Sequence, residues 1–232
     1  MVVHGYRGEH HGLEPVVAHL RGLRIVSPDL PGFGDSSPLP GRTHDIAAYS
    51  EWLSAFVDAL GLRGTAVILG HSFGSIVASA AVAAGLATPK LILVNPIAAP
   101  ALEGPNRFGS QLTLGFYRTA RALPEAVGKG LLSFPPIVRG MSAFLVQTKD
   151  GALRRWIHDQ HSTYFSRYAN RDTVVQGFRG ARPDLLRGLD DAAADPPQLA
   201  GVGDEEPVEE GEGADGEYGD LEPVADRVVA GA

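Results

Sequence analysis

The residues Gly70-His71-Ser72-Phe73-Gly74 decide the fold because of what stands on either side of them. Residues 65–69 are apolar and partly β-branched, which predicts a short buried strand. Residues 75–84 are rich in alanine and predict a helix packed closely on its neighbours. A serine between two glycines at a strand-to-helix turn is typical of a catalytic nucleophile, whose hydroxyl projects above the sheet edge. We therefore expect Ser72 to be a nucleophile; the alternative is an ordinary tight turn.

Strand-like and helical segments alternate through the first 96 residues. This alternation predicts an α/β fold with a mostly parallel sheet and helices on both faces. Helices are expected over 9–20 and 46–60, the second capped by Thr43 or Asp45. The expected strands lie near residues 1–4, 23–27, 64–69 and 90–95.

The pattern changes after residue 96, and it divides the chain into three parts. Residues 1–96 form the expected core with the nucleophile turn. Residues 97–180 hold aromatic-rich helical stretches near 111–123, 137–147 and 153–168 and no convincing strand, which predicts a helical lid insertion. Open α/β sheets bind ligands at the carboxyl edge of their strands, so we expect the lid to cover an apolar pocket there.

Residues 181–232 are expected to be an acidic, disordered tail. Residues 190–232 carry 14 of the 27 acidic side chains and one basic residue, Arg227. Such a segment has too little apolar surface to offset its ordering entropy. The net charge of −7 therefore belongs to the tail, and the rest of the chain is mildly basic. No basic run with interleaved aromatic residues indicates nucleic-acid binding.

Composition excludes several kinds of site and predicts the location. The sequence has no cysteine, so a disulfide framework, a thiol nucleophile and a cysteine-ligated metal are excluded. No H-E-x-x-H spacing supports a zinc site, and we expect no cofactor or metal. No signal peptide or apolar run long enough to span a membrane is present, which predicts a cytoplasmic protein. The oligomeric state is not indicated.

Three motifs together resemble the α/β-hydrolase superfamily, in its branch of lidded serine hydrolases. Residues 4–8 (His-Gly-Tyr-Arg-Gly) look like the family's oxyanion loop, which begins with His-Gly. Residues 29–37 (Asp-Leu-Pro-Gly-Phe-Gly-Asp-Ser-Ser) look like its DxPGFGxS segment. Residues 70–75 look like its nucleophile turn. The order and spacing of all three make the resemblance specific.

The resemblance implies a role for each residue around the serine. The oxyanion hole would be formed by the backbone N–H groups of Tyr6 and Phe73, which would stabilise a tetrahedral intermediate. The residues expected to support these loops are His4, Gly5, Gly70, His71 and Gly74.

The sequence departs from the family at the rest of the triad and at the sheet edge. The superfamily places its acid and then its histidine after the serine, but no histidine follows His161. Residues 203–208 (Gly-Asp-Glu-Glu-Pro-Val) faintly resemble the family's acid turn and would put Glu206 at the acid position, beside Asp204. His158 and His161 could replace the missing base, although polar lid residues are the favoured interpretation. The strands that usually precede the oxyanion loop are not represented either.

The resemblance implies a serine hydrolase that cleaves carboxylic-ester or similar acyl bonds through an acyl-enzyme. Without a C-terminal histidine we expect this activity to be impaired. The substrate would be small, apolar and ester-like. The alternative is a non-catalytic pseudo-hydrolase that binds an apolar small molecule in the lidded pocket. A third hypothesis is an interaction protein that works through its acidic tail.

Overall fold

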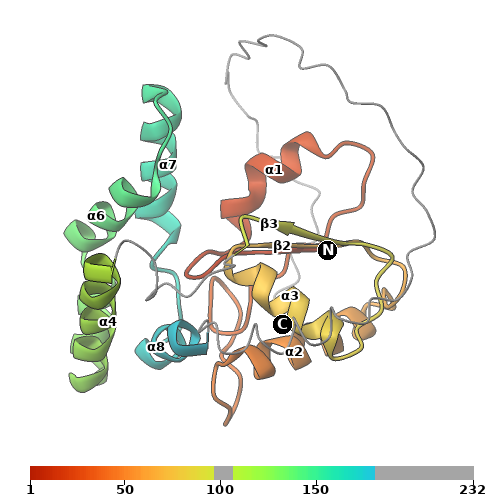
Figure 1. Cartoon of the computed structure of the whole chain (residues 1–232), viewed down its shortest axis with the longest axis horizontal. Coiled ribbons are helices and arrows are strands. Elements are labelled where there is room, and N and C mark those ends of the chain that lie inside the picture. Colours follow the sequence, from red (N-terminus) through yellow and green to blue (C-terminus); the bar gives the residue numbers. More distant parts are fainter. Residues whose placement is uncertain (97–106, 181–232) are drawn as a thin grey trace.

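A three-stranded parallel sheet organises the computed structural model, which describes residues 1–96 and 107–180 (Figure 1). The strands are β1 (Val2–Val3), β2 (Ile68–His71) and β3 (Leu91–Val94), in the order β1-β2-β3. In the register, Val2 lies opposite Leu69 and Ile68 lies opposite Leu91. The central strand therefore delivers its carboxyl end, and the serine after it, between two parallel neighbours.

Helices cover both faces of the sheet, as the alternation predicts. The 3-10 helix η1 (His10–Leu13) and helix α1 (Glu14–His19) lie on one face, and α2 (Ile46–Ala59) and α3 (Phe73–Ala83) lie on the other (Figure 1). Asp45 caps α2 by accepting the backbone N–H of Ala48 at 2.9 Å.

Two of the strand predictions need correction. Residues 23–27 form no strand: the Val2 N–H donates to Val26 O at 2.8 Å, but no ladder follows, and Leu23 is 64% exposed. The strand expected over 64–69 begins only at Ile68 because the N–H groups of Thr65 and Ala66 are bonded to Leu62 O in a turn. Local β propensity is overridden in both places by where the backbone hydrogen bonds go.

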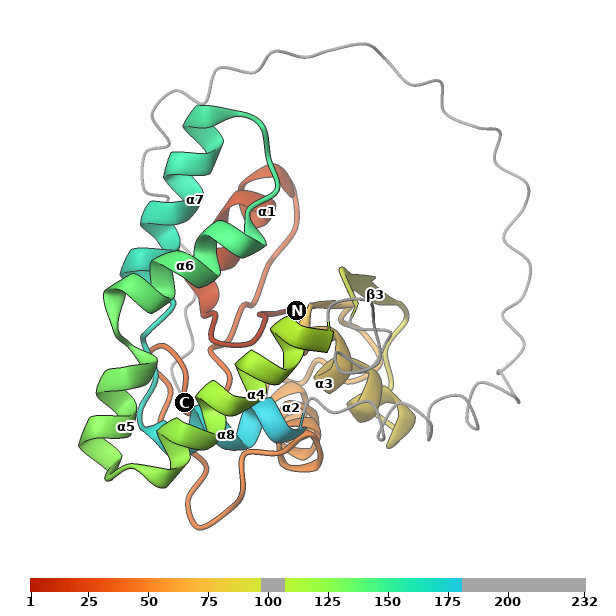
Figure 2. The same cartoon turned by 60° about the vertical axis from the view of Figure 1, so that its left-hand side comes forward.

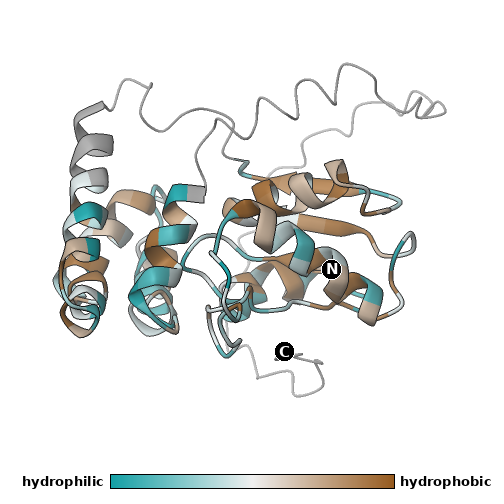
Figure 3. Ribbon diagram, turned by 90° about the horizontal axis from the view of Figure 1, so that it is seen from below, coloured by the Kyte–Doolittle hydropathy of each residue, from teal (hydrophilic) through white to brown (hydrophobic). Residues whose placement is uncertain are grey.

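A helical segment follows β3 and stands beside the sheet (Figure 2). The three predicted helical stretches are present, and two further helices, over 125–132 and 171–180, were not predicted. Tyr117, Leu132 and Val174 of this segment share one buried apolar cluster with Phe33 and Phe73 of the core. Figure 3 shows apolar residues concentrated in the sheet and its flanking helices. The helices are α4 (Arg107–Ala122), α5 (Glu125–Leu132), α6 (Pro135–Leu145), α7 (Gly151–Tyr164) and α8 (Arg171–Gly180).

The expected acidic tail, with Glu206, lies outside the described residues. Within the described residues, no helix combines the length and the apolar character needed to cross a membrane.

Candidate active site

Ser72 lies at the turn between β2 and α3, where the sequence places it. Its backbone has φ 51° and ψ −115°, a conformation that non-glycine residues rarely adopt. Its N–H donates to Val94 O at 2.9 Å, and its carbonyl accepts the Ser75 N–H at 2.9 Å. The half-buried serine is therefore held in a strained geometry at the amino end of α3, which favours developing negative charge.

The glycines around Ser72 are required by close backbone approaches. A Cβ on Gly70 would lie 2.5 Å from Gly74 O, and a Cβ on Gly74 would collide with Val3 O. Both neighbours are main-chain atoms, which cannot turn aside as a flexible side chain can. The two glycines thus let the helix pack against β1 and leave the serine at the apex of the turn.

The oxyanion loop expected from the resemblance lies directly against Ser72. A Cβ on Gly5 would sit 3.3 Å from Ser72 Cβ. The next residue, Tyr6, packs its ring 5.8 Å from the ring of Phe73, and its hydroxyl donates to Val174 O at 2.5 Å. Burial raises the pKa of Tyr6 well above its usual value, so the hydroxyl stays protonated. The two residues expected to supply oxyanion donors are therefore neighbours.

His4 supports this loop, with both ring nitrogens engaged. The Leu30 backbone N–H donates to Nε2 at 2.8 Å, so the ring proton is on Nδ1 and is donated to Gly5 O at 2.8 Å. His4 is 1% exposed, and burial lowers its pKa. The neutral ring therefore joins the oxyanion loop to the segment that begins at Asp29.

Asp29 organises that second segment. Its buried carboxylate accepts the backbone N–H of His10 at 2.8 Å and that of Asp35 at 3.0 Å. Gly34, at φ 53°, passes so close that a Cβ would collide with the carboxylate. These contacts fold residues 29–36 into a compact loop that is joined to His4 through Leu30.

None of the eight histidines, all of which the structure describes, hydrogen-bonds Ser72. His10 and His11 are paired with carboxylates. His44 accepts the Leu39 N–H on Nε2, and the exposed His19 bonds Pro15 O. His71 is the last residue of β2 and lies beside Gly5, and burial lowers its pKa. A general base for Ser72 is therefore not among these contacts.

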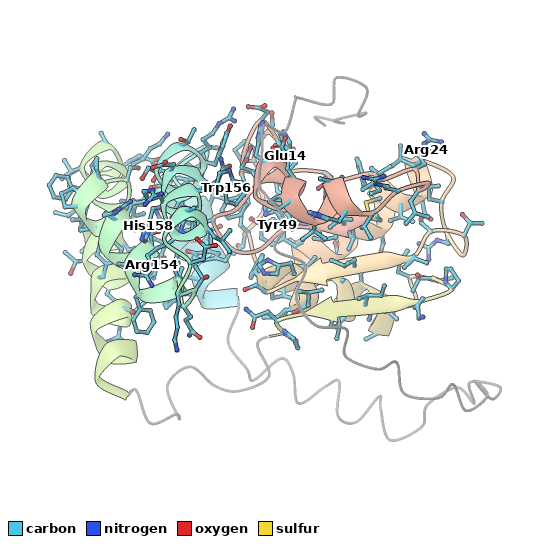
Figure 4. The ribbon with its side chains drawn as sticks, turned by 90° about the horizontal axis from the view of Figure 1, so that it is seen from above. Glu14, Arg24, Tyr49, Arg154, Trp156 and His158 are labelled. Atoms are coloured by element: carbon cyan, nitrogen blue, oxygen red, sulfur yellow. The ribbon has the colours of Figure 1, made fainter. Side chains whose placement is uncertain are left out.

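His158 and His161, the alternative base, face a different serine. Ser142 Oγ lies 2.6 Å from Nδ1 of His158 and 2.8 Å from Nδ1 of His161. Figure 4 shows His158 on α7 among the helices, with Tyr49 between it and Arg24 at the other end of the core. Helix α7 also stands apart from α3 in Figures 1 and 2. The pair joins α6 to α7 and makes no hydrogen bond with Ser72.

A second cluster near η1 has the chemistry of a metal site. Glu9, His10 and His11 each place one ligand-type atom within 4.8 Å of the others. The Glu9 carboxylate already meets Nδ1 of His11 at 2.8 Å and the guanidinium of Arg167 at 3.4 Å. Nδ1 of His10 is bonded to Asp29 at 2.9 Å. These bonds tie η1 and its preceding residue to Asp29 and to Arg167, which follows α7.

One surface hollow lies away from Ser72. It has a volume of about 320 Å³ and lies between residues 38–44 and residues 170–176. Its lining includes Arg42, His44 and Asp172 and none of Ser72, Tyr6 or Phe73. It is therefore not the apolar pocket expected at the nucleophile.

Sequence reasoning missed the contacts of Arg7 and Ser142. Arg7 is fully buried although arginine is a surface residue in most proteins. Its place within the oxyanion motif was the only signal available. Ser142 had no signal of its own, whereas the i, i+3 spacing of the two histidines did indicate a shared face.

Comparison with known proteins agrees with the fold. A model of the Alpha/beta hydrolase family matches residues 1–227. A pimeloyl-[acyl-carrier protein] methyl ester esterase from Shewanella woodyi is 33% identical over 81 residues, which are 35% of this chain and 28% of that protein. The match thus spans less than a third of that relative's length.

Two solved esterases share the architecture. The esterase EaEST from Exiguobacterium antarcticum has a TM-score of 0.60 at 20% identity, covering 82% of this chain and 69% of that one. A thermophilic esterase from Thermogutta terrifontis has a TM-score of 0.56 at 24% identity, covering 79% and 63%. At this identity the likeness concerns the fold alone. With the family model matching nearly the whole length, the chain belongs to the alpha/beta hydrolase family.

Proposed function

We propose that the chain is a serine hydrolase that attacks carboxylic-ester or similar acyl bonds with Ser72. The observation that carries the proposal is the strained φ of 51° at Ser72 between β2 and α3, with the oxyanion loop packed against it. The Ser72 oxygen would add to the acyl carbon, and the backbone N–H groups of Tyr6 and Phe73 would stabilise the resulting oxyanion. Loss of the alcohol would leave an acyl-enzyme, which water would hydrolyse.

The substrate class follows from the relatives and the surroundings of the site. One relative is named a methyl ester esterase and two structural neighbours are esterases. The rings of Tyr6, Phe73 and Tyr117 lie near the nucleophile turn. We assign residues 97–180 as a lid, and a small apolar ester as the substrate.

Turnover is expected to be weak because none of the eight histidines hydrogen-bonds Ser72. A neutral serine hydroxyl is a poor nucleophile near pH 7. In serine hydrolases that lack triad members, oxyanion stabilisation and binding alone leave about 10³–10⁴-fold acceleration over water. The same observation favours a second candidate function, a pseudo-hydrolase that binds an apolar small molecule without cleaving it.

Labelling with a fluorophosphonate probe, read by mass spectrometry, tests the proposal. We expect adduct on Ser72, none in Ser72→Ala, and unchanged labelling in Ser79→Ala, which alters a half-buried serine on α3, the helix that follows Ser72. Adduct elsewhere, or none on the folded protein, would contradict the hydrolase proposal. Binding of a fluorescent apolar ligand without labelling would support the pseudo-hydrolase. Rapid ester turnover lost in Ser72→Ala would show that a base does reach the serine.

A further inference from the structure

Arg7 has a backbone conformation that its residue type disfavours. The Gly8 N–H donates to Gly5 O at 3.0 Å and closes a four-residue turn. Arg7, third in this turn, has φ 58°, while Tyr6, second in the turn, is not among the residues with positive φ. This is the pattern of a type II turn, whose third position favours glycine or asparagine. Something other than backbone preference must therefore hold Arg7 in place.

The side chain of Arg7 supplies that anchor. It is 0% exposed, and Nη2 donates to Leu132 O, at the end of α5, at 2.8 Å. The guanidinium lies 4.6 Å from the ring centre of Phe165 and 5.5 Å from that of Tyr168. Nη1 is 3.8 Å from Met141 Sδ on α6. Every one of these contacts comes from the helical segment, so the segment holds the turn from outside the core.

The burial of the Arg7 side chain is not explained by a gain in stability. Within the described residues no carboxylate pairs with Arg7, and its Nε has no hydrogen-bond partner. A buried cation without a counter-ion is costly, and contacts with aromatic faces offset only part of that cost. Strained residues that persist under such conditions cluster where the geometry serves a site. The turn in question contains Tyr6, the expected oxyanion donor.

We propose that Arg7 is a positioning residue that locks the oxyanion turn in place and couples it to the lid helices. The anchored guanidinium holds the left-handed conformation, which fixes the peptide groups on both sides of Tyr6. Movement of α5 or α6 away from the core would remove the anchor and release the turn. The catalytic part of this inference rests on the proposed function, whereas the link between anchor and turn does not.

Two substitutions separate the effect of the turn conformation from the effect of the lost side-chain packing. Arg7→Ala and Arg7→Gly both delete every side-chain contact, and they differ only in how readily the backbone adopts positive φ. Two quantities would be measured: the rate constant and apparent affinity of fluorophosphonate labelling at Ser72, and hydrogen exchange of the Gly8 amide that closes the turn. The control is Arg42→Ala, which alters an exposed arginine paired with Glu51 at 2.6 Å.

We expect Arg7→Ala to slow the labelling step by about 10²-fold, as small displacements of catalytic groups do. The apparent affinity for the probe should stay unchanged. The labelling rate constant of Arg7→Gly should remain within about tenfold of the wild-type value, because glycine adopts the turn conformation without an anchor. The Gly8 amide should lose protection in the alanine variant and keep most of it in the glycine variant. Arg42→Ala should change neither quantity.

If Arg7 contributed packing alone, glycine would be no better than alanine, and that result would overturn the proposal. Equal Gly8 protection in all variants would also overturn it, and this readout holds even if Ser72 is never labelled. If the alanine variant does not fold, Arg7→Asn and Arg7→Gln make the same comparison, since asparagine tolerates positive φ better than glutamine. The asparagine variant should then label faster and protect Gly8 better; equality would contradict the inference.

Discussion

The backbone N–H of Leu30 donates to Nε2 of His4 at 2.8 Å, so the ring must stay neutral for the loop contact to persist. Burial lowers the pKa of His4, and it is also the leading cause of the lowered pKa values of His44, His71 and His161. In the unfolded chain each histidine titrates near its ordinary value of about 6.5. The unfolded state therefore binds more protons than the folded state once the pH falls below that value.

We predict that the free energy of unfolding declines as the pH falls from about 6.5 towards the lowered folded pKa values of these histidines. Urea denaturation across the range would measure it. His4→Gln should make the decline shallower without abolishing it, because three other histidines act in the same direction. A steeper decline in the His4 variant would contradict this prediction.

Gly74→Ala should be strongly destabilising. The added Cβ would collide with the backbone oxygens of Val3, in β1, and His4, directly after it. Overpacking of this kind costs about 1–3 kcal/mol, and more where main-chain atoms must move. The matched control is Gly140→Ala in α6, where nothing lies within 4 Å. That variant should be stabilised by up to about 1 kcal/mol through helix propensity. Similar changes in the two melting temperatures would refute the steric argument.

Ser142→Ala should loosen the joint between α6 and α7. The hydroxyl can donate to Nδ1 of one histidine and accept from Nδ1 of the other, so it satisfies both rings at once. Its removal leaves buried polar nitrogens without a partner, which costs about 1–3 kcal/mol. Ser162→Ala removes only a hydroxyl bonded to His158 O within α7. Its free energy of unfolding should stay within about 0.5 kcal/mol of the wild-type value. Denaturation and hydrogen exchange across the two helices would compare them.

The parts of the fold that were predictable are those set by local pattern. The motif around Ser72 predicts the strand, the turn and the helix because each depends on neighbouring residues and on glycine at fixed offsets. The apolar spacing of Tyr49, Leu53 and Val57 places α2 correctly, and all three are buried. The strand prediction for residues 23–27 failed because a strand needs a partner strand with a continuous ladder of hydrogen bonds, which composition cannot show.

The site was less predictable because its geometry depends on distant contacts. The roles of Arg7 and Ser142 arise from residues more than ten positions away, such as Leu132 for Arg7 and His158 for Ser142. Glu9, His10 and His11 are consecutive in the sequence, but the ion pair of Glu9 with Arg167 is a contact that only the structure shows. Spacing suggested that His158 and His161 share a face, but only the packing of α6 shows what that face meets.

The last prediction concerns β3, whose residues Ile92, Leu93 and Val94 are 37%, 42% and 39% exposed. Consecutive strand residues point to opposite faces, so apolar side chains are exposed on both faces. Within the described part of the chain, β2 is the only strand that pairs with β3, which leaves one backbone edge open to another strand. Edges of this kind favour pairing between chains.

We expect the protein to associate as its concentration is raised, and Ile92→Lys to weaken that association because a charge on an edge strand opposes pairing. The control, Val127→Lys, places the same charge at an exposed position on α5 and should have no effect. Analytical ultracentrifugation would decide: a wild-type protein that stays monomeric throughout, or equal effects of the two lysines, would show that β3 is not the site of association.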